Sequence, residues 1–202
     1  MKSLIITAHP DDETIWMGGF IIRHRSWDWH TLSLSRAGDP DRAFRFEQAG
    51  DELGATTYMS DLDDSPILLP LDLREIKSRI RAIVPSEFDL IFTHGPAGEY
   101  GHLRHMEVHK AVAELIAAGE LTAEAVLYFA YADGRPDSGA DAAVTLSSNE
   151  FARKRHIIRD IYGFREGSFE YESAGPLETF HAHDPDAMTH SKTAALQLDR
   201  RG

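Results

Sequence analysis

The chain has 202 residues, of which 42% are hydrophobic, and this size suits one domain with a single sizeable core. It contains no cysteine, which excludes disulfides and thiolate ligands, so any metal must be held by His, Asp, Glu or carbonyl oxygen. The formal charge of −12 and the lack of a Lys/Arg cluster argue against a nucleic-acid partner.

The sequence carries no signal for a membrane. No apolar run approaches the roughly 20 residues that a spanning helix needs. The first twenty residues do not read as a signal peptide, because their apolar run is short and is interrupted by Asp11–Glu13. We therefore expect a cytoplasmic protein with no membrane partner, and we leave open whether it forms a homo-oligomer.

Short β-type runs alternate with helical stretches along the first 162 residues. The expected strands are Leu4–Thr7, His30–Leu34, Thr56–Met59, Leu90–Thr93 and Ala125–Phe129. The expected helices are Asp12–Arg25, Arg42–Leu53, Leu71–Val84, His102–Ala118 and Glu150–Tyr162. Such alternation is typical of βαβ units. We predict an α/β fold, a single Rossmann-like three-layer domain over residues 1–202 with a mostly parallel sheet and helices on both faces.

Two segments do not follow this pattern. Gly134–Ser148 is rich in Gly, Asp, Ser and Ala, and we predict a surface loop or a lid there. From about residue 170 the periodicity fades, and we expect an irregular C-terminal segment.

Polar residues follow each expected strand of the sheet. In an open α/β sheet, ligands bind beyond the carboxyl ends of the strands, so these residues are expected to meet at one rim. They are Ala8–Asp12, Arg36–Asp39, Asp61, His94–Gly95 and Asp133–Gly134.

The first of these segments, AHPDDE, combines one imidazole with three carboxylates. Acids in the first turn of a helix are favoured by the helix dipole, which accounts for Asp11, Asp12 and Glu13 without any catalysis. It does not account for His9, a polar side chain at the tip of an apolar strand, where Pro10 favours an extended backbone. His9 and Asp12 can therefore face one metal ion, and Asp11 can reach a bound water.

A second cluster, GEYGHLRHMEVH, follows the fourth expected strand. His102, His105 and His109 recur at spacings of three and four, so they share one helical face. The spacing is not that of a zincin helix, because Glu107 lies roughly opposite this face. His109 also aligns with apolar positions and is expected to pack in the core. Two His and one carboxylate suit Zn²⁺ with an open position, and equally non-haem Fe²⁺.

These motifs together resemble the PIG-L/LmbE family of zinc-dependent N-deacetylases, which act on N-acetylglucosaminyl phosphatidylinositol and related amino sugars. The resemblance includes RAFRFEQAGDELGA at Arg42–Ala55, runs from Ser3 to about Tyr131, and has a weaker late segment at Tyr171–Phe180. It implies an enzyme that hydrolyses the N-acetyl group of an N-acetylglucosamine-type sugar or conjugate.

The resemblance also implies roles for matching residues. His9, Asp12 and His105 would be the ligands of Zn²⁺, with Fe²⁺ or another divalent metal as the alternative. Asp11 would be the general base that deprotonates the metal-bound water. His102 would stabilise the oxyanion and protonate the leaving amine.

Substrate contacts follow from the same comparison. Arg42 matches the helix arginine that contacts the sugar, with Arg45 as its competitor, and Tyr100 could reach the carbonyl oxygen. One departure is Arg104, because family members commonly carry Asp there, beside the histidine that corresponds to His102. We expect Arg104 to point to solvent, so that another group must orient His102.

Two other function classes remain open at this stage. One is a non-catalytic sugar- or metal-binding module, although Asp11, which a metal does not require, weighs against it. The other is a different metal-dependent hydrolase on the same scaffold, such as a phosphatase.

Overall fold

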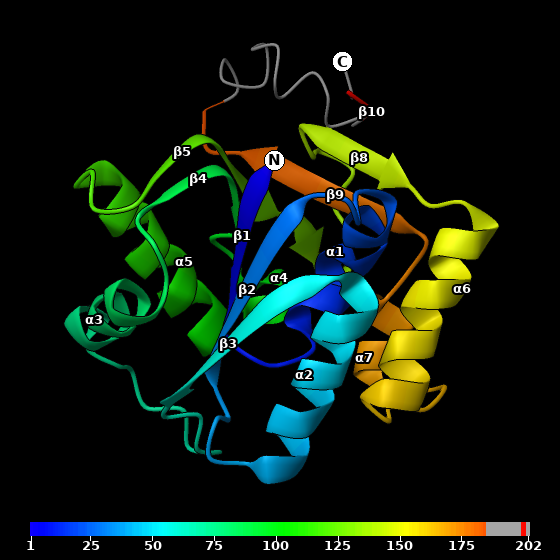
Figure 1. Ribbon diagram of the computed structural model, residues 1–202, viewed down its shortest axis with the longest axis horizontal. Coiled ribbons are helices and arrows are strands. Elements are labelled where there is room, and N and C mark those ends of the chain that lie inside the picture. The colour runs from blue at the N-terminus through cyan, green and yellow to red at the C-terminus, as the bar shows by residue number, and fades with distance from the viewer. Residues whose placement is uncertain (185–198, 201–202) are drawn as a thin grey trace.

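The computed structural model describes residues 1–184 and 199–200, and its centre is an eight-stranded sheet of order β10-β8-β9-β5-β4-β1-β2-β3 (Figure 1). Five neighbouring strands are parallel. They are β1 (Lys2–Thr7), β2 (Asp28–Ser35), β3 (Ala55–Leu62), β4 (Glu87–Thr93) and β5 (Thr122–Phe129). Antiparallel strands extend the sheet beyond β5. They are β8 (Ala142–Thr145), β9 (Leu177–Ala182) and β10 (Asp199–Arg200), and β6 (Tyr131–Ala132) with β7 (Arg135–Pro136) forms a separate ribbon.

Helices cover both faces of this sheet (Figure 1). On one side lie α3 (Leu73–Ile83) and α5 (Leu103–Ala117). The other side carries α1 (Asp12–Arg23), α2 (Pro40–Leu53), α6 (Ser148–His156), the π-helical turn η1 (Ile157–Ile161) and α7 (Phe169–Ser173), and a short helix α4 (Gly98–Gly101) precedes α5.

Two hydrophobic cores result, one on each face of the sheet. Successive residues of a strand point to opposite faces, so Ile5 enters one core while Leu4 and Ile6 enter the other. The predicted fold class, a mostly parallel α/β sheet between helical layers, is confirmed.

The expected strands and helices of the first 162 residues are all present, with ends shifted by a few residues. The prediction of a loop at Gly134–Ser148 is wrong in part, because β8 lies there with Ala142, Ala143 and Val144 buried. The prediction of an irregular segment from about residue 170 is also wrong for α7 and β9. These elements are too short to show periodicity, and they are held by pairing with strands distant in sequence. Residues 185–198 and 201–202 of that predicted segment lie outside the described residues.

A fully buried ion pair joins α6 to β9 beneath helix α1. Lys154 Nζ lies 2.7 Å from Glu178 Oε1, and neither side chain is exposed. The two oxygens of Glu178 also accept the backbone N–H groups of Gly19 and Phe20, each at 2.8 Å. Helix α1 is broken at Met17, which has a φ of −149°, so these N–H groups act as the start of its second half. The carboxylate therefore caps a helix segment inside the core.

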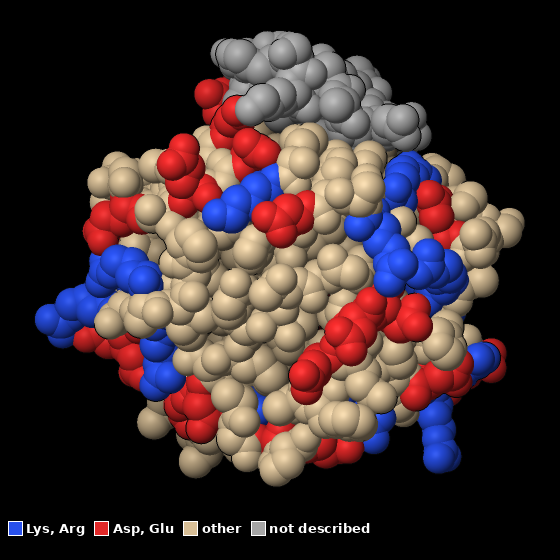
Figure 2. All heavy atoms as spheres, viewed as in Figure 1, with Lys and Arg blue, Asp and Glu red and all other residues tan. Residues whose placement is uncertain are grey.

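Charges of both signs are mixed on the visible surface. On the face shown in Figure 2, acidic and basic side chains lie next to one another around a broad central area of other residues, and neither sign gathers into one large patch. None of the helices in the described part of the chain is both long and apolar enough to span a bilayer.

The order of the parallel strands fixes where a ligand can bind. Strand β1 lies between β2 and β4, so the chain leaves β1 toward one side of the sheet and returns to β4 on the other. A crevice opens at such a switch point, beyond the carboxyl ends of the strands. His9 lies two residues after β1, and His94 directly follows β4. The fold therefore brings two histidines to this crevice.

Candidate active site

The turn after β1 presents its side chains through an unusual backbone. Asp11 has a φ of 138°, a backbone conformation that residues other than glycine rarely adopt. Its carbonyl accepts the N–H groups of Thr14 and Ile15, both at 2.9 Å, and its own N–H donates to Glu13 Oε2 at 3.1 Å. Glu13 is buried and also accepts the Tyr162 hydroxyl at 2.6 Å, so it braces the turn and faces away from the crevice.

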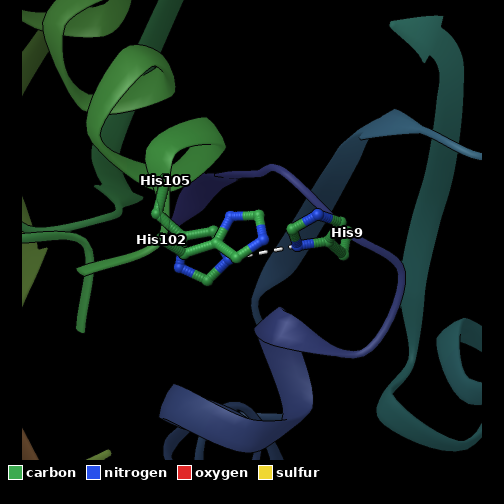
Figure 3. A group of neighbouring side chains, drawn as sticks. All are labelled: His9, His102 and His105. Atoms are coloured by element: carbon green, nitrogen blue, oxygen red, sulfur yellow. Dashed lines mark hydrogen bonds between the residues drawn. The ribbon is translucent and has the colours of Figure 1, made fainter. Parts of the chain in front are cut away.

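Three potential ligand atoms converge at the crevice. His9 Nδ1 lies 3.1 Å from His105 Nε2 and 3.3 Å from Asp12 Oδ2, and His105 Nε2 lies 3.5 Å from the same Asp12 oxygen. Figure 3 shows His9 reaching from the loop after β1 toward His105 and His102 near the start of α5. Asp12 is held in place because Oδ2 accepts the backbone N–H of His9 and Oδ1 accepts the Trp16 indole N–H.

Each of these two imidazoles is oriented by a carboxylate on its other nitrogen. His9 Nε2 lies 3.1 Å from Asp64 Oδ1, and His105 Nδ1 lies 2.6 Å from Glu99 Oε2. Because an ionised carboxylate only accepts, these nitrogens carry the protons. When both rings are neutral, His9 Nδ1 and His105 Nε2 therefore present their lone pairs on the side of Asp12 Oδ2.

Three such atoms repel one another unless a cation lies among them. Burial lowers the pKa of His9, but hydrogen bonds to Asp12 and Asp64 outweigh it and raise the pKa to about 10. Burial lowers the pKa of His105 to about 4. Without a metal, a proton on His9 Nδ1 is therefore shared with His105. A divalent ion can replace that proton, since the ligand atoms of tetrahedral zinc lie about 3.4 Å apart, close to the observed separations. The donor set fits a divalent metal.

The sequence predicted that His94 lies at the rim of the sheet, but it did not indicate that His94 contacts this cluster. Its ring stacks on that of His105 with centroids 3.9 Å apart, and its Nδ1 shares Glu99 Oε2 at 2.7 Å. Its Nε2 lies 3.5 Å from Asp12 but accepts the Ala8 N–H at 2.9 Å, so this lone pair is already used. His94 therefore supports the cluster and is a poor ligand. Its position at the end of β4 was the only sequence signal.

Glu99 is the second residue whose part the sequence did not reveal. It lies in α4 with a φ of 56°, and its backbone carbonyl accepts the Gly134 N–H at 3.1 Å. This left-handed conformation turns the buried carboxylate under both His94 and His105. Asp64, which contacts His9 Nε2, is the third residue whose role the sequence did not reveal. Nothing in its local sequence distinguishes it from the neighbouring acids.

Asp11 lies beside the cluster without joining it. The residue is 7% exposed, and its Oδ2 lies 3.4 Å from Arg42 Nη1. Burial raises the pKa of Asp11 and the Asp12 carboxylate raises it further, while Arg42 lowers it. Arg42 also lies over the Phe164 ring at 5.2 Å. Arg45, the competitor of Arg42, pairs instead with Asp41 and the Ile161 carbonyl.

His102 precedes α5 and adjoins the same cluster. Its ring centroid lies 4.8 Å from that of His9, and its Nδ1 has no hydrogen-bond partner among the described residues. Burial lowers the pKa of His102, and the charge on His9 lowers it further. The nearby carboxylate of Glu99 is bound to the other two histidines, His94 and His105. His102 is therefore a neutral imidazole near pH 7.

The expectation that Arg104 points to solvent is wrong. The residue is 1% exposed, and its guanidinium pairs with Glu107 Oε2 at 2.7 Å. It also donates to the carbonyls of Asp63 at 2.6 Å and Leu69 at 2.9 Å. The loop after β3 folds over the start of α5 and covers it. Arg104 therefore points neither into the crevice nor to water.

The cluster opens into a cavity of about 210 Å³. Its wall includes His9, Asp11, Asp12, Trp16, Arg36, Arg42, Asp64, Tyr100, His102, Phe169 and Glu170. The Tyr100 and Phe169 rings meet at its rim with centroids 4.5 Å apart, and both remain partly exposed. His109, which the sequence predicted to pack in the core, lies elsewhere and is half-buried, where it donates to the His94 carbonyl and packs on Tyr128. The sequence-predicted residues Arg42 and Tyr100 both line the cavity.

Comparison with known proteins assigns the chain to a family. Residues 4–116, more than half of the chain, match the PIG-L family, described as GlcNAc-PI de-N-acetylase. The chain belongs to the PIG-L family. The match spans β1 to α5 and so contains the two motifs that build the cluster. No curated protein sequence matches this PIG-L chain.

Solved structures share the fold of this PIG-L protein at low sequence identity. The conserved protein TT1542 from Thermus thermophilus has a TM-score of 0.69 and 16% identity, covering 92% of this chain and 95% of its own. The N,N'-diacetylchitobiose deacetylase from Pyrococcus horikoshii has a TM-score of 0.66 and 16% identity, and the match covers 94% of this chain and 86% of the deacetylase. GalB, the 4-carboxy-2-hydroxymuconate hydratase from Pseudomonas putida, has a TM-score of 0.64 and 17% identity, and the match covers 92% of this chain and 97% of GalB. The fold therefore occurs in a deacetylase and in a hydratase.

Proposed function

We propose that this PIG-L protein is a metal-dependent N-deacetylase that hydrolyses the N-acetyl group of an N-acetylglucosamine-type sugar or conjugate. The observation that carries the proposal is a carboxylate, Asp11, held in the wall of a cavity beside a cluster of three ligand atoms. Family membership and the deacetylase among the similar structures support the choice of amide hydrolysis.

His9, Asp12 and His105 would hold the metal, with Zn²⁺ as our first choice and Fe²⁺ as the alternative. When bound, a divalent ion polarises the amide carbonyl and lowers the pKa of a coordinated water. Asp64 and Glu99 keep the ring nitrogens of the two histidines aimed at that position. Asp12 is fixed by the Trp16 indole, so its second oxygen is not free to rotate away.

Asp11 is the proposed general base. It is not needed to complete the ligand set, and Arg42 holds its carboxylate at the cavity wall. It accepts a proton from the attacking water and, once protonated, can return that proton to the amine nitrogen as the C–N bond breaks. His102, a neutral imidazole near pH 7, can donate an N–H to the oxygen that becomes negatively charged.

The experiment that tests this proposal combines metal analysis with acetate release. We expect one divalent ion per chain, and acetate release from N-acetylated amino sugars that chelation abolishes and Zn²⁺ or another divalent metal restores. His105→Ala should lose the metal, whereas His109→Ala, a matched change on the same helix, should retain it. Full metal content in His105→Ala with loss in His109→Ala would refute this choice of third ligand.

Other reactions on this scaffold give different results in the same experiment. A chain that binds one metal and releases no acetate from any sugar in the panel would refute the deacetylase proposal. It would favour a non-catalytic binding module, or a reaction such as hydration of a double bond, for which the fold of GalB gives a precedent.

The aromatic rim is the proposed contact for the sugar ring. Truncating Phe169 to alanine should raise KM about 2- to 10-fold with little change in kcat, because stacking is worth roughly 0.5–1.5 kcal/mol and is made equally before and during the reaction. Steady-state kinetics on the best substrate of the panel measures this. Phe44→Ala is the control, since Phe44 is 58% exposed on α2 and does not line the cavity. An unchanged KM in Phe169→Ala would mean that the sugar binds elsewhere.

A further inference from the structure

His9 depends on a residue from a distant loop. Asp64 Oδ1 contacts His9 Nε2 at 3.1 Å, although the two residues are 55 positions apart in the chain. The other oxygen of Asp64 is held by Arg36, whose Nη2 and Nε lie 2.6 and 3.0 Å away. The side chain is only 9% exposed and cannot rotate without breaking one of these contacts. The direction of the His9 ring is therefore set by where the backbone of the loop places Asp64.

That loop, residues 63–71, connects β3 toward α3 and is fastened to helix α5. Arg104 donates to the carbonyls of Asp63 and Leu69, which lie on either side of Asp64 along the loop. Glu107 holds the guanidinium through Oε2 and accepts the Leu71 N–H through Oε1 at 2.8 Å. Three backbone groups of the loop are thus bound by one buried ion pair.

We propose that Arg104 and Asp64 act as positioning residues for the metal site, an inference that rests on the proposed function. Arg104 holds the loop, the loop places Asp64, and Asp64 orients His9. Arg104 directly precedes His105, so the same turn of α5 fixes one proposed ligand directly and the other through the loop. The separation of the two imidazoles then depends on Arg104.

Neutralising Asp64 tests the first step. Asp64→Asn keeps the shape of the side chain but removes the charge that holds His9 Nε2–H, so the dissociation constant for Zn²⁺ should rise about 10- to 100-fold. The constant is measured on metal-stripped protein by competition with a chromogenic chelator, with the absorption spectrum of the Co²⁺-loaded protein as a second readout. Asp61→Asn is the matched control, because Asp61 lies three residues earlier, at the end of β3, and its carboxylate accepts the Gly38 N–H and not a histidine N–H. The control should bind Zn²⁺ like the wild type.

Arg104→Lys tests the second step. Lysine keeps the charge beside Glu107, but it lacks the planar guanidinium that binds two carbonyls and a carboxylate at once. The affinity for Zn²⁺ should therefore fall again. If both residues act by one route, the double variant should bind Zn²⁺ no more weakly than the weaker of the two single variants. Should Arg104→Lys fail to fold, Asp64→Asn decides by itself.

Two results would overturn the inference: unchanged Zn²⁺ affinity in Asp64→Asn, or losses that simply add in the double variant. Neither depends on turnover. A wild-type protein that binds Zn²⁺ and releases no acetate would contradict the proposed function and leave the positioning route intact.

Discussion

Replacing Asp11 by asparagine is expected to lower kcat about 10²- to 10⁴-fold while the protein keeps its metal. Asparagine fits the same space and can still meet Arg42, but it cannot accept a proton at neutral pH. The three ligand atoms of His9, Asp12 and His105 are untouched by the change. Acetate release and metal content, measured on the same preparation, test both halves of the expectation.

The neighbouring carboxylate provides the comparison. Asp12→Ala should lose the metal as well as activity, because it removes the oxygen that faces both histidines and leaves the Trp16 indole without its acceptor. Equal metal loss in Asp11→Asn and Asp12→Ala would contradict this division of roles. It would instead indicate that the acids serve only as a charged helix start.

The largest effect on stability is expected at the buried ion pair of Lys154 and Glu178. Lys154→Met should lower the free energy of unfolding by about 3–5 kcal/mol, because the carboxylate stays buried without its counter-charge. Both side chains are fully buried and 2.7 Å apart, so water cannot take over the role of the ammonium. Urea unfolding of the metal-free protein measures the change.

A matched substitution at the surface separates burial from the loss of an ion pair. Lys77→Met removes the partner of Glu114, 2.6 Å away, in a pair that solvent reaches, so it should cost at most about 1 kcal/mol. Adding Glu178→Gln to Lys154→Met should recover part of the loss, since no charge is then buried. Equal losses in Lys154→Met and Lys77→Met would show that Glu178 is stabilised by its two backbone N–H donors alone.

The sequence by itself determined the parallel half of the fold and the composition of the proposed site. Short apolar strands and helices longer than ten residues carry a local signal, and they are the elements of the parallel half that the structure contains. His9, Asp11 and Asp12 lie within one strand-to-helix turn, so their proximity follows from local geometry. The meeting of this turn with His105 could also be expected, because the carboxyl ends of neighbouring parallel strands share an edge.

Only the tertiary structure decided what surrounds these residues. Asp64 meets His9 across 55 residues and Arg104 meets Asp63 across 41, and neither contact leaves a periodic trace in the sequence. An arginine on a helix is most often exposed, so burial of Arg104 depended on a loop that happens to close over it and supply carbonyl acceptors. The antiparallel strands β8 and β9 could not be predicted from the sequence for the same reason. Strands of four and six residues are stable only through hydrogen bonds to partners that the fold must first bring together.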